Sequence, residues 1–394
     1  MTDDIFDHLS ASLTDGLLCP ALNSLSCVFT KLSTRFIPYF LSPHLTHLTI
    51  RVHLFHYLRY PRDLLPDPAP ILRILPTPCL QELSLGVDAD RLHHLKDEFD
   101  SMVKRCGHFL RVLDVPAPLG EAAVHHVMGL RNLRAWDHVC SPPPATLPLS
   151  ANFPPLQTLF LSRRDAYRWI LWLARRETEI FGAHDRSIEN VGLKKTLTRL
   201  GFHDPVPIDA AFISPLSRFS NLIVLHVRSH CSEASGCVFS LTNQNVAQLS
   251  VGLPRLELLE LGRVCAINTC PTTVACFLAL SVHCGRLHTL RTHWSTTNLI
   301  SDIRSLSEDP DFRDLSGSPA RCALTNLHTG SLPFPQDASD EDVTALAMGL
   351  LKIFPCLLRV FSRSEPGWNV LDLRVRELQR VGSPTSRPPE PPQV

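Results

Sequence analysis

The residues with the clearest capacity for chemistry are four cysteines and two histidines close together in the chain. They are Cys265, Cys270, Cys276, Cys284, His283 and His288. Thiolate sulfur and imidazole nitrogen are preferred ligands of Zn²⁺, so a zinc site is one interpretation. The spacing matches no compact ligand pattern, and the 13 cysteines include no Cys-x-x-Cys pair. We therefore favour buried, reduced thiols, and we expect neither a metal nor a cofactor.

Known catalytic motifs are missing from the sequence. It contains no phosphate-binding glycine loop, no dinucleotide fingerprint, no His-Glu-x-x-His motif and no Gly-x-Ser-x-Gly motif. The 19 histidines are spread along the chain and do not gather with carboxylates. The sequence therefore offers no positive reason to expect an enzyme.

A short leucine-rich phrase recurs along the chain, and a second set of candidate residues, arginines and histidines, lies within its copies. The phrase reads Leu-x-x-Leu-x-(Leu/Ile/Val), and its copies begin 23 to 41 residues apart. Clear copies begin at Leu45, Leu80, Leu110, Leu156, Leu222 and Leu256, and looser copies at Leu22, Leu133, Leu197, Leu287, Leu324 and Leu357. Such repetition is typical of a solenoid, in which each unit buries its apolar side only against the next.

Proline stands two positions before the first leucine in half of the copies. These prolines are Pro20, Pro43, Pro78, Pro154, Pro254 and Pro355. Because proline cannot continue a helix, the phrase predicts a helix end, a short turn and a strand. The segments between phrases show helical spacing, for example 242–253 and 339–350. Ser339 is a predicted N-cap, with Asp342 at the capping-box position.

Helices of this length allow the strands to pair in parallel. We predict an α/β fold, an irregular leucine-rich-repeat solenoid with parallel strands on a concave face and helices on a convex face. Residues 1–20 are expected to form an N-terminal cap, residues 21–381 about 11–12 repeat units, and residues 382–394 a disordered proline-rich tail. The alternative is a closed (β/α) barrel, which has eight units and seldom repeats a phrase.

The long interval between Leu156 and Leu197 predicts an extra helix near 165–181. Trp169 and Trp172 lie on its apolar face. We expect these tryptophans to pack against neighbouring repeats. The alternative is that part of this helix is an exposed docking ridge.

Positions 3, 5 and 7 of each phrase point away from the core, onto the predicted concave face. The candidate partner-binding residues at these positions are Arg199, His203, His226, Arg228, Arg291, His293 and Arg359. Acidic residues at these positions, other than Glu260, lie in the first half of the chain. Guanidinium groups suit carboxylates and phosphates, so we predict that an acidic or phosphorylated segment of a partner protein binds the arginines. The alternative is that these are ordinary solvated side chains.

The overall charge of the chain is balanced. It has 38 basic and 38 acidic residues, which gives no reason to expect nucleic acid or an anionic membrane as a partner. The N-terminus does not resemble a secretory signal, and no apolar stretch is long enough to span a bilayer. We expect a cytoplasmic or nuclear protein.

Several stretches resemble one known group of proteins. They are YFLSPHLTHLTI (39–50), LTNQNVAQLSVGLPRLELLELG (241–262), NTCPTTVACFLALSVHCGRLHTL (268–290) and SDEDVTALAMGLLKIFPCL (339–357). Over roughly residues 15–380 the chain resembles the leucine-rich-repeat region of the F-box-like proteins of basidiomycete fungi. The resemblance implies a substrate-recognition subunit, whose F-box binds the Skp1 adaptor of a cullin-RING ubiquitin ligase while the repeats present a target.

No F-box-like run precedes Leu22. A Skp1-type adaptor is therefore expected as a partner only if an F-box is missing from this chain. We interpret the chain as a non-catalytic protein-binding scaffold related to such receptors. The alternative is a leucine-rich-repeat inhibitor or structural scaffold that binds an enzyme on its concave face, without ligase association.

Overall fold

The computed structural model describes most of the chain, in two compact units. The described residues are 8, 17–28, 36–51, 69–75, 78–86, 95–139, 143, 154–162, 165–182, 193–202, 208–227, 239–262, 272–292, 294, 296, 298–308, 322–330, 332, 334–335, 337–362 and 366–382. The N-terminal unit comprises Met1–Asp204 and the C-terminal unit Pro205–Val394. The predicted cap at 1–20 is described only at residue 8 and from residue 17. The predicted tail lies outside the described residues, apart from Gly382.

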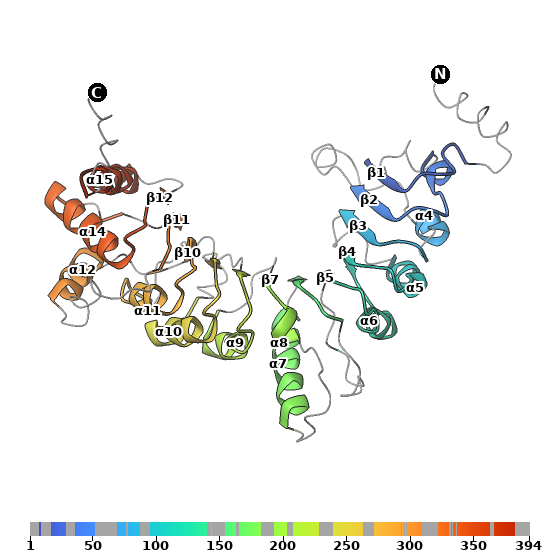
Figure 1. Cartoon of the computed structure of the whole chain (residues 1–394), viewed down its shortest axis with the longest axis horizontal. Helices are drawn as coiled ribbons and strands as arrows, with labels where there is room; N and C mark the ends of the chain where they lie inside the picture. The colour runs from blue at the N-terminus through green and yellow to red at the C-terminus, as the bar shows by residue number, and fades with distance from the viewer. Residues whose placement is uncertain are drawn as a thin grey trace, which may run out of the picture. The chain divides into compact units, whose positions relative to one another are not determined.

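The N-terminal unit is a parallel sheet with helices along one side (Figure 1). Its strands are β1 (Ser24–Val28), β2 (His47–Arg51), β3 (Glu82–Gly86), β4 (Val112–Pro118), β5 (Ala135–Val139), β6 (Thr158–Ser162) and β7 (Arg199–Phe202). Its helices are η1 (Ile37–Phe40), α4 (Ala69–Ile74), α5 (Lys96–Arg105), α6 (Glu121–Met128), α7 (Ala166–Gly182) and α8 (Leu193–Thr196). Each strand pairs in parallel with the next strand of the chain.

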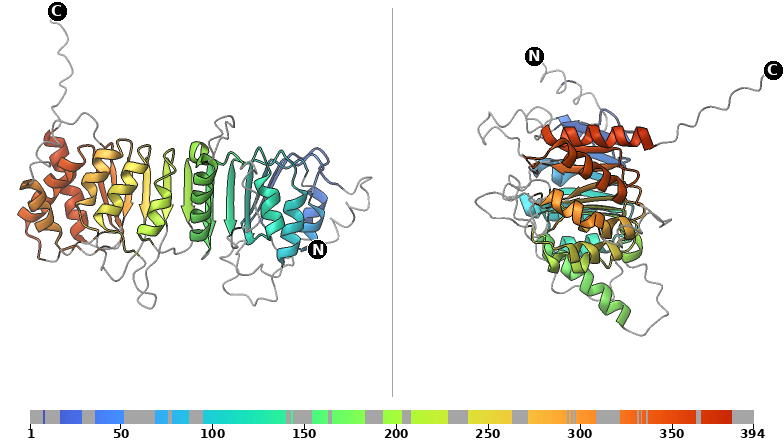
Figure 2. Two further views of the ribbon diagram at one scale, coloured as in Figure 1. Left: turned by 90° about the horizontal axis from the view of Figure 1, so that it is seen from below. Right: turned by 90° about the vertical axis from the view of Figure 1, so that its left-hand side faces the viewer.

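The C-terminal unit repeats the same arrangement (Figure 2). Its strands are β8 (Val224–Val227), β9 (Leu258–Leu261), β10 (Thr289–Thr292), β11 (Asn326–Gly330) and β12 (Arg359–Ser362). Its helices are α9 (Ala210–Leu216), α10 (Asn243–Gly252), α11 (Cys276–His283), α12 (Leu299–Glu308), α14 (Asp340–Ile353) and α15 (Pro366–Gly382). The strands again pair in parallel and in chain order.

This strand order excludes the barrel and confirms the α/β leucine-rich-repeat solenoid. In a closed barrel the first strand would pair with the last. In the described chain β1 neighbours only β2, and β12 neighbours only β11. All twelve phrases form strands, and within each unit every strand follows its predecessor without a change of order. Each unit is therefore an open stack of strands and helices.

The pairing register is the register of the repeated phrase. Leu48 pairs with Leu83, which pairs with Leu113, and each of these position-4 leucines is fully buried. Because side chains alternate along a strand, positions 3, 5 and 7 project from the opposite side of each sheet. We call this side the sheet face. The helices lie on the other side, where they cover the buried leucines.

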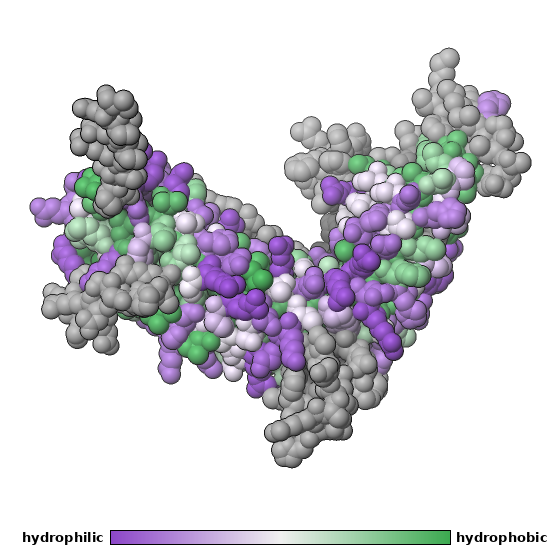
Figure 3. All heavy atoms as spheres, in the orientation of Figure 1, coloured by the Kyte–Doolittle hydropathy of each residue, from purple (hydrophilic) through white to green (hydrophobic). Residues whose placement is uncertain are grey.

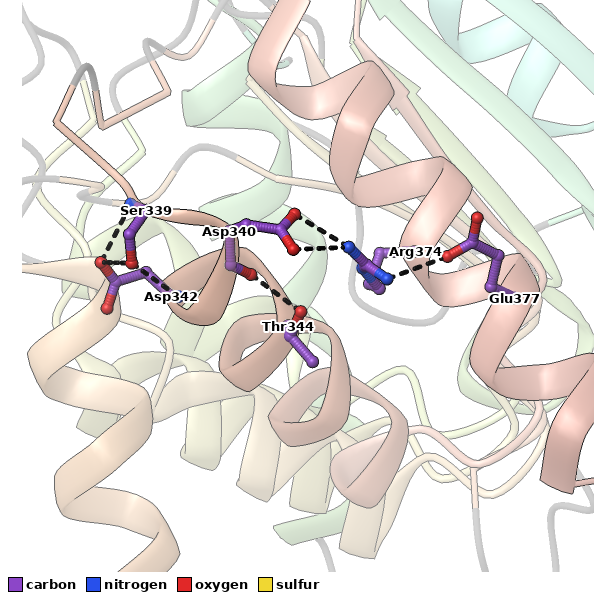
Figure 4. A network of polar contacts seen from close by, with 6 residues as sticks. All are labelled: Ser339, Asp340, Asp342, Thr344, Arg374 and Glu377. Atoms are coloured by element: carbon purple, nitrogen blue, oxygen red, sulfur yellow. Dashed lines mark hydrogen bonds and ion pairs between the residues drawn. The ribbon is translucent and has the colours of Figure 1, made fainter.

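Local sequence signals determine the helix ends. The Ser339 hydroxyl accepts a hydrogen bond from the Asp342 N–H, and the Asp342 carboxylate accepts one from the Ser339 N–H, which confirms the predicted capping box (Figure 4). Thr242 and Asn245 form the same arrangement at the start of α10. Pro254 and Pro355 follow the ends of α10 and α14, where they prevent the helices from continuing.

The last helix, α15, packs on both β12 and α14. Arg374 of α15 donates to both carboxylate oxygens of Asp340, at 2.8 and 2.9 Å, and to Glu377 at 3.1 Å (Figure 4). The Asp372 carboxylate of α15 accepts a hydrogen bond from the Val360 N–H of β12 at 2.7 Å. The helix therefore covers β12 with both apolar and polar contacts.

Helix α7 lies in the N-terminal unit, in the region where the sequence predicts an extra helix. Trp169, Ile170 and Leu173 are buried, which agrees with the packing interpretation, and Trp172 is half-buried. The Trp169 ring packs edge-on against Trp136 of β5, with the centroids 5.8 Å apart. The described half of this helix is therefore part of the core.

A histidine occupies a core position beneath α7. His138 stands at position 6 of its phrase, where Leu161 stands in the next strand, and it is fully buried. Its ring centroid lies 4.6 Å from that of Trp136 and 5.0 Å from that of Trp169. Burial lowers the pKa of His138 to about 3, so the imidazole is neutral in the folded chain at neutral pH.

We predict that His138 makes the N-terminal unit acid-sensitive. An exposed histidine in the unfolded chain has a pKa of about 6.5. Between pH 6.5 and pH 3 the unfolded chain therefore binds a proton that the folded chain does not. The free energy of unfolding should fall by up to about 1.4 kcal/mol for each unit of pH decrease in this window. His138→Leu should show a shallower pH dependence when hydrogen exchange of β5 and α7 is measured from pH 7 to pH 4. Equal slopes for both proteins would contradict the prediction.

Candidate functional site

Four of the seven predicted binding residues lie within the described chain. His226, Arg291 and Arg359 belong to the C-terminal unit, and Arg199 begins β7 of the N-terminal unit as an exposed side chain. His203, Arg228 and His293 lie outside the described residues. The candidate site is therefore built from the sheet face of the C-terminal unit.

One residue from each strand of this unit forms a row across the sheet face. His226 pairs in register with Glu260, Glu260 with Arg291, Arg291 with His328, and His328 with Phe361. All five stand at position 5 of the phrase. Because neighbouring strands lie about 4.8 Å apart, consecutive side chains of the row are in contact range. We call these five residues the position-5 row.

Glu260, the second residue of the row, is buried between His226 and Arg291. Its side chain is 2% exposed and accepts a hydrogen bond from Nδ1 of His226 at 2.8 Å. Nη1 of Arg291 lies 3.9 Å from its other carboxylate oxygen. The sequence correctly placed Glu260 on the sheet face but did not predict its burial, which arises because residues of adjacent strands flank it. A buried carboxylate needs such partners, since its desolvation is costly.

The other end of the row is aromatic. The rings of His328 and Phe361 stack, with centroids 4.6 Å apart and an angle of 13° between their planes. Burial, together with the nearby guanidinium of Arg291, lowers the pKa of His328 to about 4, although Glu260 opposes this shift. His328 is therefore neutral at physiological pH. His328 lies on β11, between Arg291 of β10 and Arg359 of β12, and Phe361 lies on β12, two residues after Arg359.

Arg359 flanks the aromatic pair from position 3 of β12. Its guanidinium carbon lies 4.8 Å from the Phe361 ring centroid, a cation–π distance. Its Nε donates to Asp372 of α15 at 3.4 Å. The side chains of Arg291 and Arg359 are 44% and 46% exposed, so both guanidinium groups retain donors that face solvent. These two groups can bind carboxylate or phosphate oxygens.

Sequence reasoning missed Phe361 and Asp372. Phe361 had a usable signal, because it stands at position 5 of its phrase, but it is neither charged nor a histidine and so did not match the predicted charge pattern. Asp372 lies in a helix outside the phrase, and no sequence pattern connects it with Arg359. Its role depends on the packing of α15 against β12.

The His226–Glu260 pair also resembles part of a hydrolase site, in which a carboxylate orients an imidazole for general base catalysis. Such a site needs a nucleophile within hydrogen-bond reach of the imidazole. Among the described residues, no serine, threonine or cysteine side chain hydrogen-bonds to His226. Among the contacts that the structure describes, the pair places the Glu260 carboxylate 3.9 Å from Nη1 of Arg291.

The sheet face of the N-terminal unit carries acidic residues. The Ser84 hydroxyl donates to the Asp114 carboxylate at 2.6 Å, and Asp114 pairs in register with Asp137. Nε2 of His47 lies 3.8 Å from a carboxylate oxygen of Glu82. This distribution agrees with the predicted excess of acidic residues in the first half of the chain.

The cysteine group is only partly described. Cys265 and Cys270 lie outside the described residues, whereas Cys276 and Cys284 are buried. Burial raises the pKa of the Cys284 thiol to about 12, and a protonated thiol is a poor metal ligand and a poor nucleophile. Within the described stretches, no group of three or more His, Cys, Asp or Glu residues is placed to hold a metal ion.

The surface shows hydrophilic and hydrophobic residues side by side in both units (Figure 3). Exposed large apolar residues such as Ile74, Phe109, Val251 and Met348 come from different elements. Among the described helices, none combines the length and hydropathy needed to span a bilayer. Exposed apolar residues therefore do not distinguish the candidate site from the rest of the described surface, whereas its charged and aromatic side chains do.

Comparison with known proteins does not assign the chain to a family. No protein-family model and no curated protein matches the sequence. Among solved structures, the chain is similar to an internalin (inlF) from Listeria monocytogenes, with 13% sequence identity and a TM-score of 0.32, over 82% of this chain and 69% of that chain. At that identity and TM-score the similarity carries no argument. The assignment to the leucine-rich-repeat fold depends on the strand order and register of this chain.

Proposed function

We propose that this chain is a non-catalytic protein-binding scaffold whose partner docks on the sheet face of the C-terminal unit. The proposal depends on the position-5 row, in which the buried Glu260 carboxylate lies beside the exposed Arg291, and on Arg359, which lies against the stacked pair of His328 and Phe361. Five strands about 4.8 Å apart present a surface about 20 Å wide, which suits a protein segment better than a metabolite.

The resemblance to F-box-like proteins supports a finer version of this proposal. In that version the chain recognises substrates of a ubiquitin ligase, and a Skp1-type adaptor joins it through an F-box supplied outside this sequence. The alternative is an inhibitor or structural scaffold that binds an enzyme without ligase association. Co-purification of a Skp1-type adaptor with the full-length protein separates the two, since only the first version expects the adaptor.

Charge reversal at Arg291 is expected to weaken partner binding at least tenfold. Arg291→Glu places a carboxylate beside Glu260 and removes an exposed cation from the centre of the row. The matched control is Arg286→Glu, which makes the same change at an exposed residue of the turn before β10, off the sheet face. Proteins captured from native cell extract by each variant should be compared quantitatively, and binding should then be repeated with the purified partner.

A partner retained by Arg286→Glu and lost with Arg291→Glu would support the proposal. Circular dichroism of both variants would verify that they are folded. If every captured protein were recovered equally with both variants, the sheet face of the C-terminal unit would not be the docking surface.

A further inference from the structure

We propose that the position-5 row, together with Arg359, binds an extended acidic segment in which two carboxylate side chains, four residues apart, flank an apolar side chain. This inference rests on the proposed function, because it assigns the ligand chemistry of the same surface. It commits to an unmodified acidic segment of a partner protein.

The spacing of the two arginines determines the spacing of the carboxylates. Arg291 pairs in register with His328, and Arg359 pairs with Asn326, two residues earlier on β11. The two arginines are two strands apart, at about 4.8 Å per strand, and two residues apart along the strand direction, at about 3.3 Å per residue. Their Cα atoms are therefore about 12 Å apart. In an extended peptide, residues i and i+4 are about 13 Å apart and their side chains project from the same side, with residue i+2 between them.

The surface beside the arginines favours an apolar residue at the centre of the segment. His328 lies on the strand between the two arginines and stacks on Phe361 of the next strand, and both side chains are half-buried. The low pKa of His328 keeps this pair uncharged at neutral pH. A cationic side chain at the centre would be repelled by the two guanidinium groups, whereas an apolar or aromatic one would gain contact area with the rings.

The surroundings of each guanidinium group favour carboxylate over phosphate. Arg291 already lies 3.9 Å from Glu260, and Arg359 already donates to Asp372 at 3.4 Å. Each arginine is therefore partly neutralised and has donors for one further monoanionic group. A dianionic phosphate at either guanidinium group would leave more negative charge uncompensated beside Glu260 or Asp372 than a carboxylate would.

Calorimetric titration of the full-length protein with short synthetic peptides tests the inference. The first peptide has the core glutamate–serine–phenylalanine–serine–glutamate between glycines. A second has the same composition with its two glutamates adjacent, and a third replaces the central phenylalanine by serine. A fourth carries one phosphoserine and no glutamate. We expect the first peptide to bind at least tenfold more tightly than the second and the fourth, and about fivefold more tightly than the third.

Variants of the protein identify the site. Arg291→Glu and Arg359→Gln should each weaken binding of the first peptide at least tenfold, whereas Arg286→Glu should change it less than twofold. A peptide with lysine in place of both glutamates should not bind. This control tests the charge requirement with the unaltered protein, so it does not depend on whether a variant folds. Circular dichroism verifies the fold of each variant.

The outcomes distinguish this inference from the proposed function. If the four peptides bound equally, or the phosphoserine peptide bound most tightly, the inference would be wrong. It would also be wrong if the first peptide bound regardless of Arg291 and Arg359. In each case the proposed function would still stand if a native partner were lost with Arg291→Glu and retained with Arg286→Glu.

Discussion

Replacement of Trp368 by alanine is expected to lower the free energy of unfolding of the C-terminal unit by about 3–5 kcal/mol. Trp368 is fully buried in α15, and its Nε1 donates to the Leu332 carbonyl at 2.9 Å. Its ring packs edge-on against Phe334, with centroids 5.1 Å apart, and lies 5.9 Å from Trp294. The substitution leaves a large cavity and an unpaired carbonyl oxygen. Hydrogen exchange of β12 and α14 should report the loss, because α15 covers both elements.

Two further variants separate the contributions to this effect. Val370→Ala changes a 46% exposed residue of the same helix and should cost less than about 0.5 kcal/mol. Trp368→Phe retains much of the ring contact but removes the hydrogen bond to Leu332. If Trp368→Ala left the exchange protection of β12 unchanged, α15 would not be the element that stabilises this strand.

Gly107→Ala is expected to lower the free energy of unfolding of the N-terminal unit by about 3 kcal/mol. Gly107 lies in the turn between α5 and β4, against the turn before β3. A Cβ atom there would overlap the carbonyl oxygen of Pro78, which belongs to the backbone of that neighbouring turn. Because a backbone atom cannot rotate away as a side chain can, β3 and β4 would have to separate. Chemical denaturation followed by hydrogen exchange of both strands measures the effect.

The matched control is Gly285→Ala. Gly107 follows Cys106 and Gly285 follows Cys284, so both glycines occupy Cys-Gly turns between a helix and a strand. A Cβ atom at Gly285 would meet nothing within 4 Å, and neither glycine has a positive φ. Gly285→Ala should therefore change stability by less than about 0.5 kcal/mol. Equal losses for the two variants would show that chain flexibility, and not the contact with Pro78, explains the result.

The local features of the repeat were predictable because they depend on neighbouring residues in the sequence. The alternation within each phrase places its leucines inward. The residue types at Ser339 and Asp342 produce a capping box, and Pro355 ends the same helix. These effects act over a few residues, so they can be recognised without knowing what each element packs against.

The details of the candidate site were less predictable because they depend on residues from other repeats. Glu260 is buried by side chains about 30 residues away on either side, His226 and Arg291. Arg359 meets Asp372 only because α15 returns onto β12. Phrase position alone shows that a side chain projects from the sheet face, but not whether its neighbours cover or neutralise it.

The sequence by itself determined that this protein is a stack of parallel strand and helix units, and which face of each strand is buried. The reason is that a period of two residues in a strand and the stop signals of a helix are properties of the local chain. Only the tertiary structure decided that Glu260 is buried beside Arg291, that His328 stacks on Phe361, and that His138 lies among tryptophans. These environments depend on side chains that come together only when successive repeats pack against one another.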